Sequence, residues 1–325
     1  MITRYLAIAA LAFPACPGLA VQAEVGDIVK GHPFRKYSTV DELDRRIKFF
    51  LSEPLGAAKE LPLVVYVQGT GCSSHFMQRQ DRISSGIGAV MYDVFLGKAR
   101  VLIVDKPGVE FLDDQGQSPM QESCRPQFFH EHTLDRWAEA IAASIRSAHT
   151  LPSVDPASTL VVGHSEGGMV AVTVSNVLPS VTHVASLAGG GPNHLYVVAE
   201  YLRRQDFDPE GLVYDCWDQV QDDPQSTTRF CFDHPFRHLS GFYRTSLIEE
   251  CLKSNAHLYL VHGSADELNF VAGFDVMRAE LEANGRSAVY ERLEGADHAL
   301  NLPSQAAPEG LVAVFGRLAT WFLGK

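Results

Sequence analysis

Ser165 stands between two glycines in the run Gly163-His164-Ser165-Glu166-Gly167, directly after a short apolar run. A serine hydroxyl is a weak nucleophile until a neighbouring base takes its proton and an acid orients that base. The spacing Gly-x-Ser-x-Gly is typical of a sharp turn between a buried strand and a helix, which lifts the serine above the sheet edge. The pattern also occurs by chance, so its meaning depends on whether the chain supplies a base and an acid.

Two later segments supply these candidates. Asp266 and Glu267 follow one strand-like run, and Asp297 and His298 follow the next. Parallel strands end at the same edge of a sheet, so both segments are expected beside Ser165, in the order serine, acid, histidine. We predict Ser165 as the nucleophile, His298 as the base and Asp266 as the acid that fixes the tautomer of the base. Glu267 is an alternative acid, whereas Asp297 is expected to project away from the histidine.

Acyl transfer also needs donors for a developing oxyanion. One expected donor is the backbone N–H of Glu166, the residue after the nucleophile. The other is the backbone N–H of Thr70, in the glycine-rich run 68–72 that follows another strand-like segment. The alternative for this run is an ordinary turn between a strand and a helix.

The remaining histidines give no metal-binding pattern. His130 and His132 lack the i, i+4 spacing that places two ligands on one face of a helix. The cysteine spacings do not match a zinc site either. We therefore predict no metal and no cofactor. His164 is expected to pack or to form a hydrogen bond at the turn, and His262 is a further histidine near a loop.

Expected strands and expected helices, which must position these residues, alternate along the chain. Apolar, strand-like runs are separated by segments with apolar residues at 3- and 4-residue steps, which is the pattern of helices. This alternation predicts an α/β protein with a doubly wound, mostly parallel sheet covered on both faces. The expected strands are 46–51, 61–67, 101–104, 160–162, 181–187, 257–261 and 288–293, and the clearest expected helices are 134–148, 169–177 and 311–322.

One long segment, residues 191–254, interrupts this alternation and is called the insertion below. It is rich in aromatic and acidic residues. A connection of this length inside a compact domain is usually a functional lid or an inserted subdomain. We predict a lid over a core made of residues 24–190 and 255–325. Trp217, Phe236 and Phe242 are expected to contact an apolar substrate, the alternative being that they only pack the insertion on the core.

Composition narrows the class of protein. The 325 residues are 46% hydrophobic and carry a net charge of −12, so they lack the basic character of a nucleic-acid binder. Residues 1–23 resemble a secretory signal peptide, the alternatives being a buried first helix or a lipid attachment at Cys16. The sequence thus predicts a periplasmic or secreted protein with no stable membrane insertion after cleavage.

Cleavage after residue 23 would leave five cysteines, which is an odd number. Disulfides are expected in an oxidising compartment, and at least one thiol must stay unpaired. Cys216 and Cys231 lie close in sequence and are a candidate local pair.

At this point the chain resembles the α/β-hydrolases. The matching motifs are the run 163–168, the segment that ends at Asp266, the segment that ends at His298, and the turn at 105–108. The resemblance covers most of residues 45–325 and implies the usual cap of that fold in the insertion. It also makes the strands before Gln68 and Asp105 neighbours, so that Cys72 and Cys124 can meet. Many members have His-Gly where this chain has Gln68-Gly69, but the glycine and the backbone donor remain.

Together, these features predict a serine hydrolase that works through an acyl-enzyme. A carboxylic ester is the favoured substrate because the insertion is aromatic. A serine aminopeptidase is the first alternative, since acidic residues of the insertion or Glu166 could hold a free amino group. A hydrolase-like binding protein is the second. The expected partner is a small ester or a short peptide.

Overall fold

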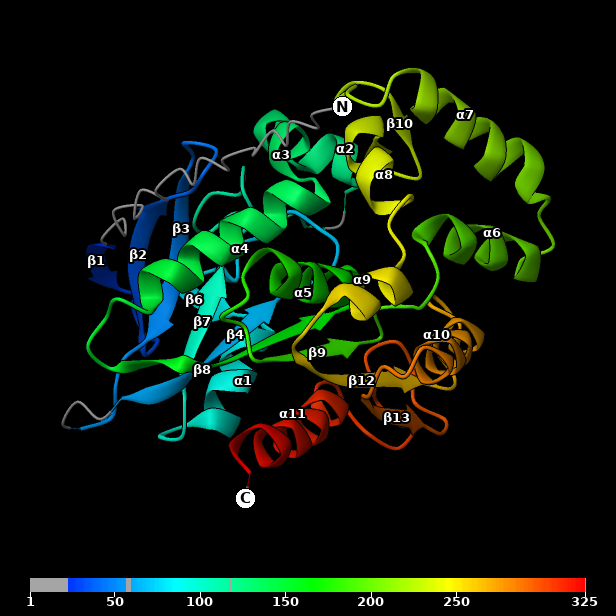
Figure 1. Cartoon of the computed structure of the whole chain (residues 1–325). Coiled ribbons are helices and arrows are strands. Elements are labelled where there is room, and N and C mark those ends of the chain that lie inside the picture. Colours follow the sequence, from blue (N-terminus) through cyan, green and yellow to red (C-terminus); the bar gives the residue numbers. More distant parts are fainter. Residues whose placement is uncertain (1–22, 57–59, 117, 325) are drawn as a thin grey trace, which may run out of the picture.

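The computed structural model describes residues 23–56, 60–116 and 118–324. Its centre is a nine-stranded sheet with the strand order β1-β2-β3-β7-β4-β8-β9-β12-β13 (Figure 1). The first three strands are antiparallel to their neighbours, and every pairing from β7 to β13 is parallel. The predicted α/β class with a mostly parallel sheet is therefore confirmed. The strands are β1 (Glu24–Ile28), β2 (Phe34–Val40), β3 (Arg46–Ser52), β4 (Leu61–Val67), β7 (Arg100–Val104), β8 (Val154–His164), β9 (His183–Leu187), β12 (His257–Gly263) and β13 (Val289–Leu293).

Helices cover both faces of this sheet (Figure 1). The central strands are apolar on both sides, as the fully buried run Arg100–Val104 shows, because helices shield each face from water. One core cluster joins the sheet to α4 (Leu134–Ala148), α5 (Glu166–Val177), α9 (Leu247–Lys253) and α10 (Val271–Ala283). The other joins it to α1 (Ile87–Phe95) and α11 (Glu309–Leu323).

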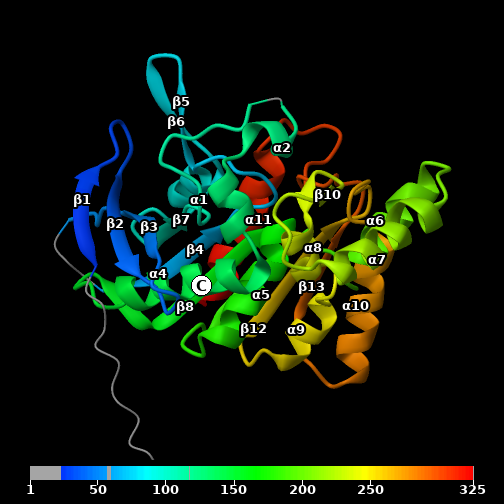
Figure 2. The same cartoon turned by 90° about the horizontal axis from the view of Figure 1, so that it is seen from above.

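Shorter elements surround the edge of the sheet at which the parallel strands end. A hairpin of β5 (Phe76–Arg79) and β6 (Arg82–Ser85) projects from the body of the molecule (Figure 2). The helices α2 (Met120–Ser123) and α3 (Pro126–Glu131) follow β7 and precede α4. None of these elements was expected from the periodicity of the sequence.

The insertion contains α6 (His194–Arg204), a π-helix (Glu210–Tyr214), α7 (Asp215–Asp222), the β10–β11 hairpin (Phe230–Cys231 with His234–Pro235) and α8 (Phe236–Phe242). It has a small core of its own, formed by Cys216, Val220, Phe236, Leu239 and Tyr243. Its last helix, α9, instead places Leu247 and Cys251 in the main core. The lid function and the limits 191–254 stay predictions, and α9 is structurally part of the body that the insertion was expected to cover.

Two disulfides join the cysteine pairs that the sequence favoured. Cys72 is bonded to Cys124, across 52 residues, and Cys216 to Cys231, across 15 residues. Cys251 is the buried, unpaired cysteine of the described chain. The signal peptide at 1–23 and the lipidation at Cys16 fall almost wholly outside the described residues. Within residues 23–56, 60–116 and 118–324, no helix is long and apolar enough to cross a membrane.

Candidate active site

The serine of the Gly-x-Ser-x-Gly run occupies a tight turn between β8 and α5. Ser165 has φ +57° and ψ −127°, a conformation that non-glycine residues adopt only where the surroundings enforce it. Its N–H donates to the Leu187 carbonyl of β9 at 2.8 Å, which holds the turn against the neighbouring strand. Gly163 is required by packing, because a Cβ there would lie 1.8 Å from the carbonyl oxygen of Gly167.

The Gly163→Ala variant is expected to lose about 3 kcal/mol of stability or more, since its methyl group can be accommodated only if the backbone shifts. Gly316→Ala is the matched control, because a Cβ at that position of α11 meets no atom within 4 Å. The control should gain up to about 1 kcal/mol from better helix propensity. Urea unfolding of both variants measures the difference, and equal midpoints would contradict the packing argument.

His298 and Asp266 lie beside this turn in a continuous chain of contacts. The Nε2 atom of His298 is 3.0 Å from the Ser165 Oγ, and its Nδ1 atom is 2.8 Å from the Asp266 Oδ2. A carboxylate only accepts hydrogen bonds, so Nδ1 carries the proton and Nε2 is free to accept the serine proton. The loops after β12 and β13 deliver these two side chains to the sheet edge that carries the serine.

Asp266 is buried, with 3% of its surface exposed, and its carboxylate is well supplied with donors. Its Oδ1 accepts the backbone N–H groups of Leu268 and Asn269 at 2.8 and 2.9 Å. Burial raises the pKa of Asp266, but the hydrogen bonds from His298 and from the Asn269 backbone N–H help to outweigh burial, so the net pKa lies below the ordinary value. The group is therefore held ionised, as an orienting acid must be.

The two rival acids occupy other positions. Glu267 is exposed. The Asp297 Oδ1 accepts the backbone N–H of Asn301 at 2.8 Å and so stabilises its own loop. The structure places Asp266, and neither rival, against the Nδ1 of His298.

His164 and His262 support the loops of the site. The Nε2–H of His164 donates to the backbone carbonyl of His298 at 2.8 Å, and burial lowers its pKa to about 4. His262 is fully buried, donates to the Asn269 carbonyl and lies 3.4 Å from the Asp266 carboxylate. Both are neutral side chains that hold the two loops in place.

The proposed oxyanion donors lie on either side of the serine. Glu166 begins α5, so its N–H stands at the positive end of the helix dipole. The loop after β4, residues 68–75 (the β4 loop), approaches so closely that a Cβ on Gly69 would lie 3.1 Å from the Ser165 Cβ. Among the described residues, the N–H groups of Thr70 and Glu166 donate to no protein acceptor. Their role as an oxyanion hole stays a prediction.

The Glu166 side chain points away from solvent into a cluster that sequence reasoning missed. It is 5% exposed and lies 3.3 Å from the Lys106 Nζ, 2.8 Å from the His132 Nε2 and 3.4 Å from the His238 Nε2. Burial raises the pKa of Glu166, but the Lys106 charge and His132 outweigh it and hold the pKa well below the ordinary value. The sequence does contain a signal for this cluster, because Glu166 is an acidic residue at the start of a helix that must be buried. A buried carboxylate requires a nearby cation, but the sequence does not show which residue supplies it.

The same cluster contains a set of atoms with the chemistry of metal ligands. Donor atoms of His132, Glu166 and His238 lie within 4.8 Å of one another. The buried Lys106 ammonium already neutralises the carboxylate and would repel a divalent cation there. The second ring nitrogen of His132 has no hydrogen-bond partner among the described residues, whereas metal-bound histidines usually have one. The donor set therefore fits a metal poorly, and the absence of a metal remains a prediction.

The three aromatic residues expected to bind substrate lie in packed surroundings. Phe236 and Phe242 are each 2% exposed, the first in the core of the insertion and the second in the main core. Trp217 is half-buried and lies 6.1 Å from the Tyr243 ring. The structure gives all three a packing role, and substrate contact stays a prediction.

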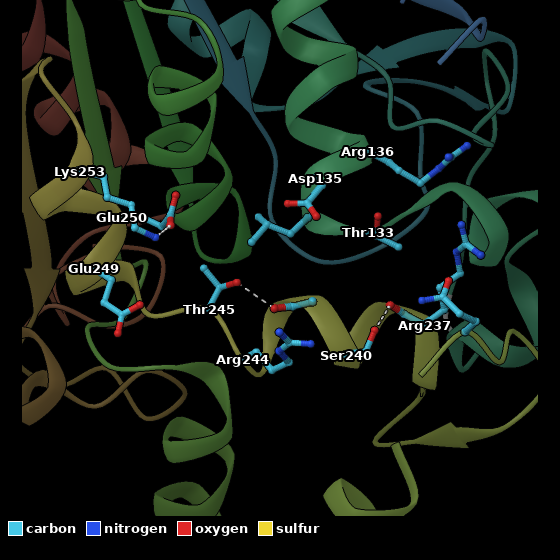
Figure 3. A pocket seen from close by; sticks show the side chains of 13 residues that line it. Thr133, Asp135, Arg136, Arg237, Ser240, Arg244, Thr245, Glu249, Glu250 and Lys253 are labelled. Atoms are coloured by element: carbon cyan, nitrogen blue, oxygen red, sulfur yellow. Dashed lines mark hydrogen bonds and ion pairs between the residues drawn. The ribbon is translucent and has the colours of Figure 1, made fainter. Parts of the chain in front are cut away.

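Several cavities adjoin the insertion and the β4 loop. One of about 230 Å³ is lined by the β4 loop, including Gln68 and Thr70. Another of about 470 Å³ opens between α4, α8 and α9 (Figure 3). The lining of neither cavity includes Ser165, Asp266 or His298. Lys253 and Glu250 form an ion pair on the wall of this second cavity. Of these two cavities, only the first is lined by a predicted oxyanion donor, Thr70.

The structure has a mostly parallel sheet and a strained serine in the turn between β8 and α5. The loops after β12 and β13 carry the aspartate and the histidine. Together these features define an α/β protein of the nucleophile-elbow type. Residues 39–314 match the family model described as the alpha/beta hydrolase family, and the chain belongs to that family. The resemblance inferred from the sequence is therefore confirmed. No curated protein matches the chain significantly.

Solved structures show the same fold at low identity. Est1E from Butyrivibrio proteoclasticus is 14% identical, with a TM-score of 0.55, over 94% of this chain and 100% of that protein. Pyrococcus horikoshii acylaminoacyl peptidase is 13% identical (TM-score 0.61, 90% of this chain), and Porphyromonas gingivalis dipeptidyl peptidase 4 is 14% identical (TM-score 0.59, 90%). The chain spans only 42% and 36% of these two peptidases, respectively.

Proposed function

We propose that this protein is a serine hydrolase that cleaves carboxylic esters through an acyl-enzyme. The observation that carries the proposal is the unbroken contact chain from the Ser165 hydroxyl through His298 to Asp266, at 3.0 and 2.8 Å. A buried carboxylate, a histidine in the required tautomer and a strained serine at a helix start are the parts that acyl transfer needs.

The reaction has two half-steps. The Ser165 oxygen attacks the ester carbonyl while His298 takes its proton, and the alcohol leaves with that proton as the C–O bond breaks. Water then attacks the acyl-enzyme, again giving a proton to His298, and the carboxylic acid leaves as the proton returns to Ser165. Asp266 stabilises the imidazolium in both half-steps, and the N–H groups of Thr70 and Glu166 stabilise the oxyanion.

The surroundings of the acidic residues favour an ester over an aminoacyl substrate. Glu166 cannot hold a free amino group, because its carboxylate is buried and paired with Lys106. In α7, the side chains of Asp215, Asp218 and Asp222 are exposed to solvent. An aminopeptidase would need a carboxylate that faces the serine.

We also propose that the protein is exported to the periplasm or the medium. The two disulfides form and persist in oxidising compartments, which agrees with the signal-like residues 1–23. The structure of Est1E with bound ferulic acid makes a hydroxycinnamate ester a sensible member of any substrate panel.

A fluorophosphonate probe tests the proposal, because it reacts with activated serines and not with ordinary hydroxyl groups. We expect one probe per wild-type chain, mapped to Ser165 by peptide mass, and none on Ser165→Ala. Ser240→Ala is the control, since that serine only donates to the Arg237 carbonyl on α8 and should leave labelling unchanged. An unlabelled wild type would favour the binding-protein alternative, and labelling that persists in Ser165→Ala would refute the mechanism.

Substrates with different leaving groups distinguish an esterase from a peptidase. Wild-type protein should hydrolyse nitrophenyl acyl esters and hydroxycinnamate esters, with little turnover of aminoacyl nitroanilides. The opposite ranking in kcat/KM would replace the ester proposal with the peptidase alternative while leaving the serine mechanism intact.

A further inference from the structure

The turn after β7 holds the β4 loop through two adjacent side chains. Asp105 accepts the Ser74 hydroxyl and the His75 N–H, both at 2.9 Å. Lys106 donates to the carbonyls of Gly69 at 2.6 Å and Gly71 at 2.9 Å. The loop that carries a proposed oxyanion donor is thus fastened at both ends to the neighbouring strand.

Lys106 is charged although it is completely buried. Its Nζ lies close to three acceptors, the two glycine carbonyls and the Glu166 carboxylate at 3.3 Å, and its side chain is 0% exposed. A neutral amine has only two hydrogens, whereas an ammonium group has the three that these acceptors require. Glu166 supplies the compensating negative charge, so the two residues form one buried ion pair.

This ion pair is connected to both proposed oxyanion donors, to one through a hydrogen bond and to the other through the covalent structure of Glu166. The Gly69 carbonyl and the Thr70 N–H belong to the same peptide unit, which is planar and trans, so they point in opposite directions. A cation that holds the carbonyl oxygen on one side therefore aims the N–H to the other. The second donor is the N–H of Glu166 itself, the residue whose side chain the cation holds.

We propose that Lys106 and Glu166 are positioning residues, which together fix the direction of the two oxyanion N–H groups. This inference rests on the proposed serine hydrolase function. It assigns the Glu166 side chain a role in orienting the backbone and no contact with substrate. Removal of the pair should weaken binding of the tetrahedral state while leaving substrate binding almost unchanged.

The test uses Lys106→Met, which keeps the length of the side chain, and Glu166→Gln, which keeps the shape and an acceptor oxygen. Each variant should lose about 10- to 100-fold in kcat, less than removal of an oxyanion donor, with KM within about threefold of wild type. Rates are expressed per active site, from fluorophosphonate titration carried to completion, so that unfolded protein does not count.

A trifluoromethyl ketone inhibitor provides a readout that a merely structural role would not move. Its adduct with serine places an oxyanion in the hole, so its Ki should rise by the same factor as kcat/KM falls in each variant. Arg100→Met is the matched control, because Arg100 is a buried cation at the other end of β7 that bonds to the Ser52 carbonyl. It should lose stability but keep kcat and Ki.

Three outcomes overturn the inference: unchanged kcat and Ki in folded variants, a loss confined to KM, or the same loss of kcat in Arg100→Met. If Lys106→Met does not fold, Glu166→Gln alone decides by the same criteria. Failure of the proposed function is distinguishable, because an unlabelled wild-type protein refutes it before any variant of the pair is made.

Discussion

The His298→Ala variant is expected to lose about a millionfold in kcat on a nitrophenyl ester, because nothing else in contact with the Ser165 hydroxyl can take its proton. The only described side chain that makes a hydrogen bond to the Ser165 Oγ is His298, at 3.0 Å. Without it, the serine retains its ordinary weak nucleophilicity, and only binding and the oxyanion donors remain. Stopped-time assays at high enzyme concentration can measure the residual rate.

His257→Ala is the control for this variant. His257 begins β12, the strand that leads to the Asp266 loop, but it is exposed and lies at the other end of the strand. It should keep activity within about twofold, as surface substitutions usually do. If His298→Ala kept a tenth or more of the wild-type kcat, His298 would not be the base.

The sequence predicted the central body well because burial on both faces leaves a strong signal. The expected strand 61–67 coincides with β4, and the expected helix 134–148 coincides with α4. In α4 the residues Trp137, Ile141 and Ile145 repeat at helical spacing and are fully buried. The predicted serine, acid and histidine each lie in the turn or loop that follows a parallel strand, so chain order alone places them at one edge of the sheet.

The edge elements were missed because their pattern is weaker. β1 is exposed along its whole length, so it has no apolar alternation to detect. β2 is only partly buried, and the β5–β6 hairpin has mostly half-buried or exposed residues. Such strands owe their structure to pairing with a neighbour, which a single sequence does not reveal.

The Lys106–Glu166 contact was missed for a different reason. The two residues are separated by 60 positions, and neither the turn after β7 nor the turn after β8 shows which side chain faces inward. A buried ion pair is a tertiary feature, whose partners become known only once the strands are ordered. The Glu166 side chain was therefore considered only as a contact for a substrate amino group in the aminopeptidase alternative, although its charge is used within the protein.

Replacing Asp266 with asparagine should lower kcat about 10,000-fold while leaving the fold intact. The amide oxygen can still accept the backbone N–H groups of Leu268 and Asn269, so the loop keeps its hydrogen bonds. The amide nitrogen would then face the Nδ1 of His298 and donate to it. That tautomer carries its proton on Nε2, which can no longer accept the proton of Ser165.

The rival acids provide matched controls for this variant. Glu267→Gln and Asp297→Asn make the same chemical change one residue from Asp266 and one residue from His298, respectively, and both should retain most of the wild-type kcat. A large loss in Glu267→Gln with little loss in Asp266→Asn would reassign the acid. Equal losses in all three variants would show a general effect of charge on the site.

Stability provides a separate check on the same carboxylate. The folded protein holds the pKa of Asp266 below its ordinary value, so the ionised group stabilises the fold at neutral pH. This contribution must disappear as pH falls through the acidic range, because protons then bind the unfolded chain more readily than the folded one. Wild type should therefore lose its stability advantage over Asp266→Asn on acidification, as measured by urea unfolding at several pH values. A difference that stayed constant with pH would mean that the carboxylate is not held ionised by His298, and the catalytic role of Asp266 would lose its electrostatic basis.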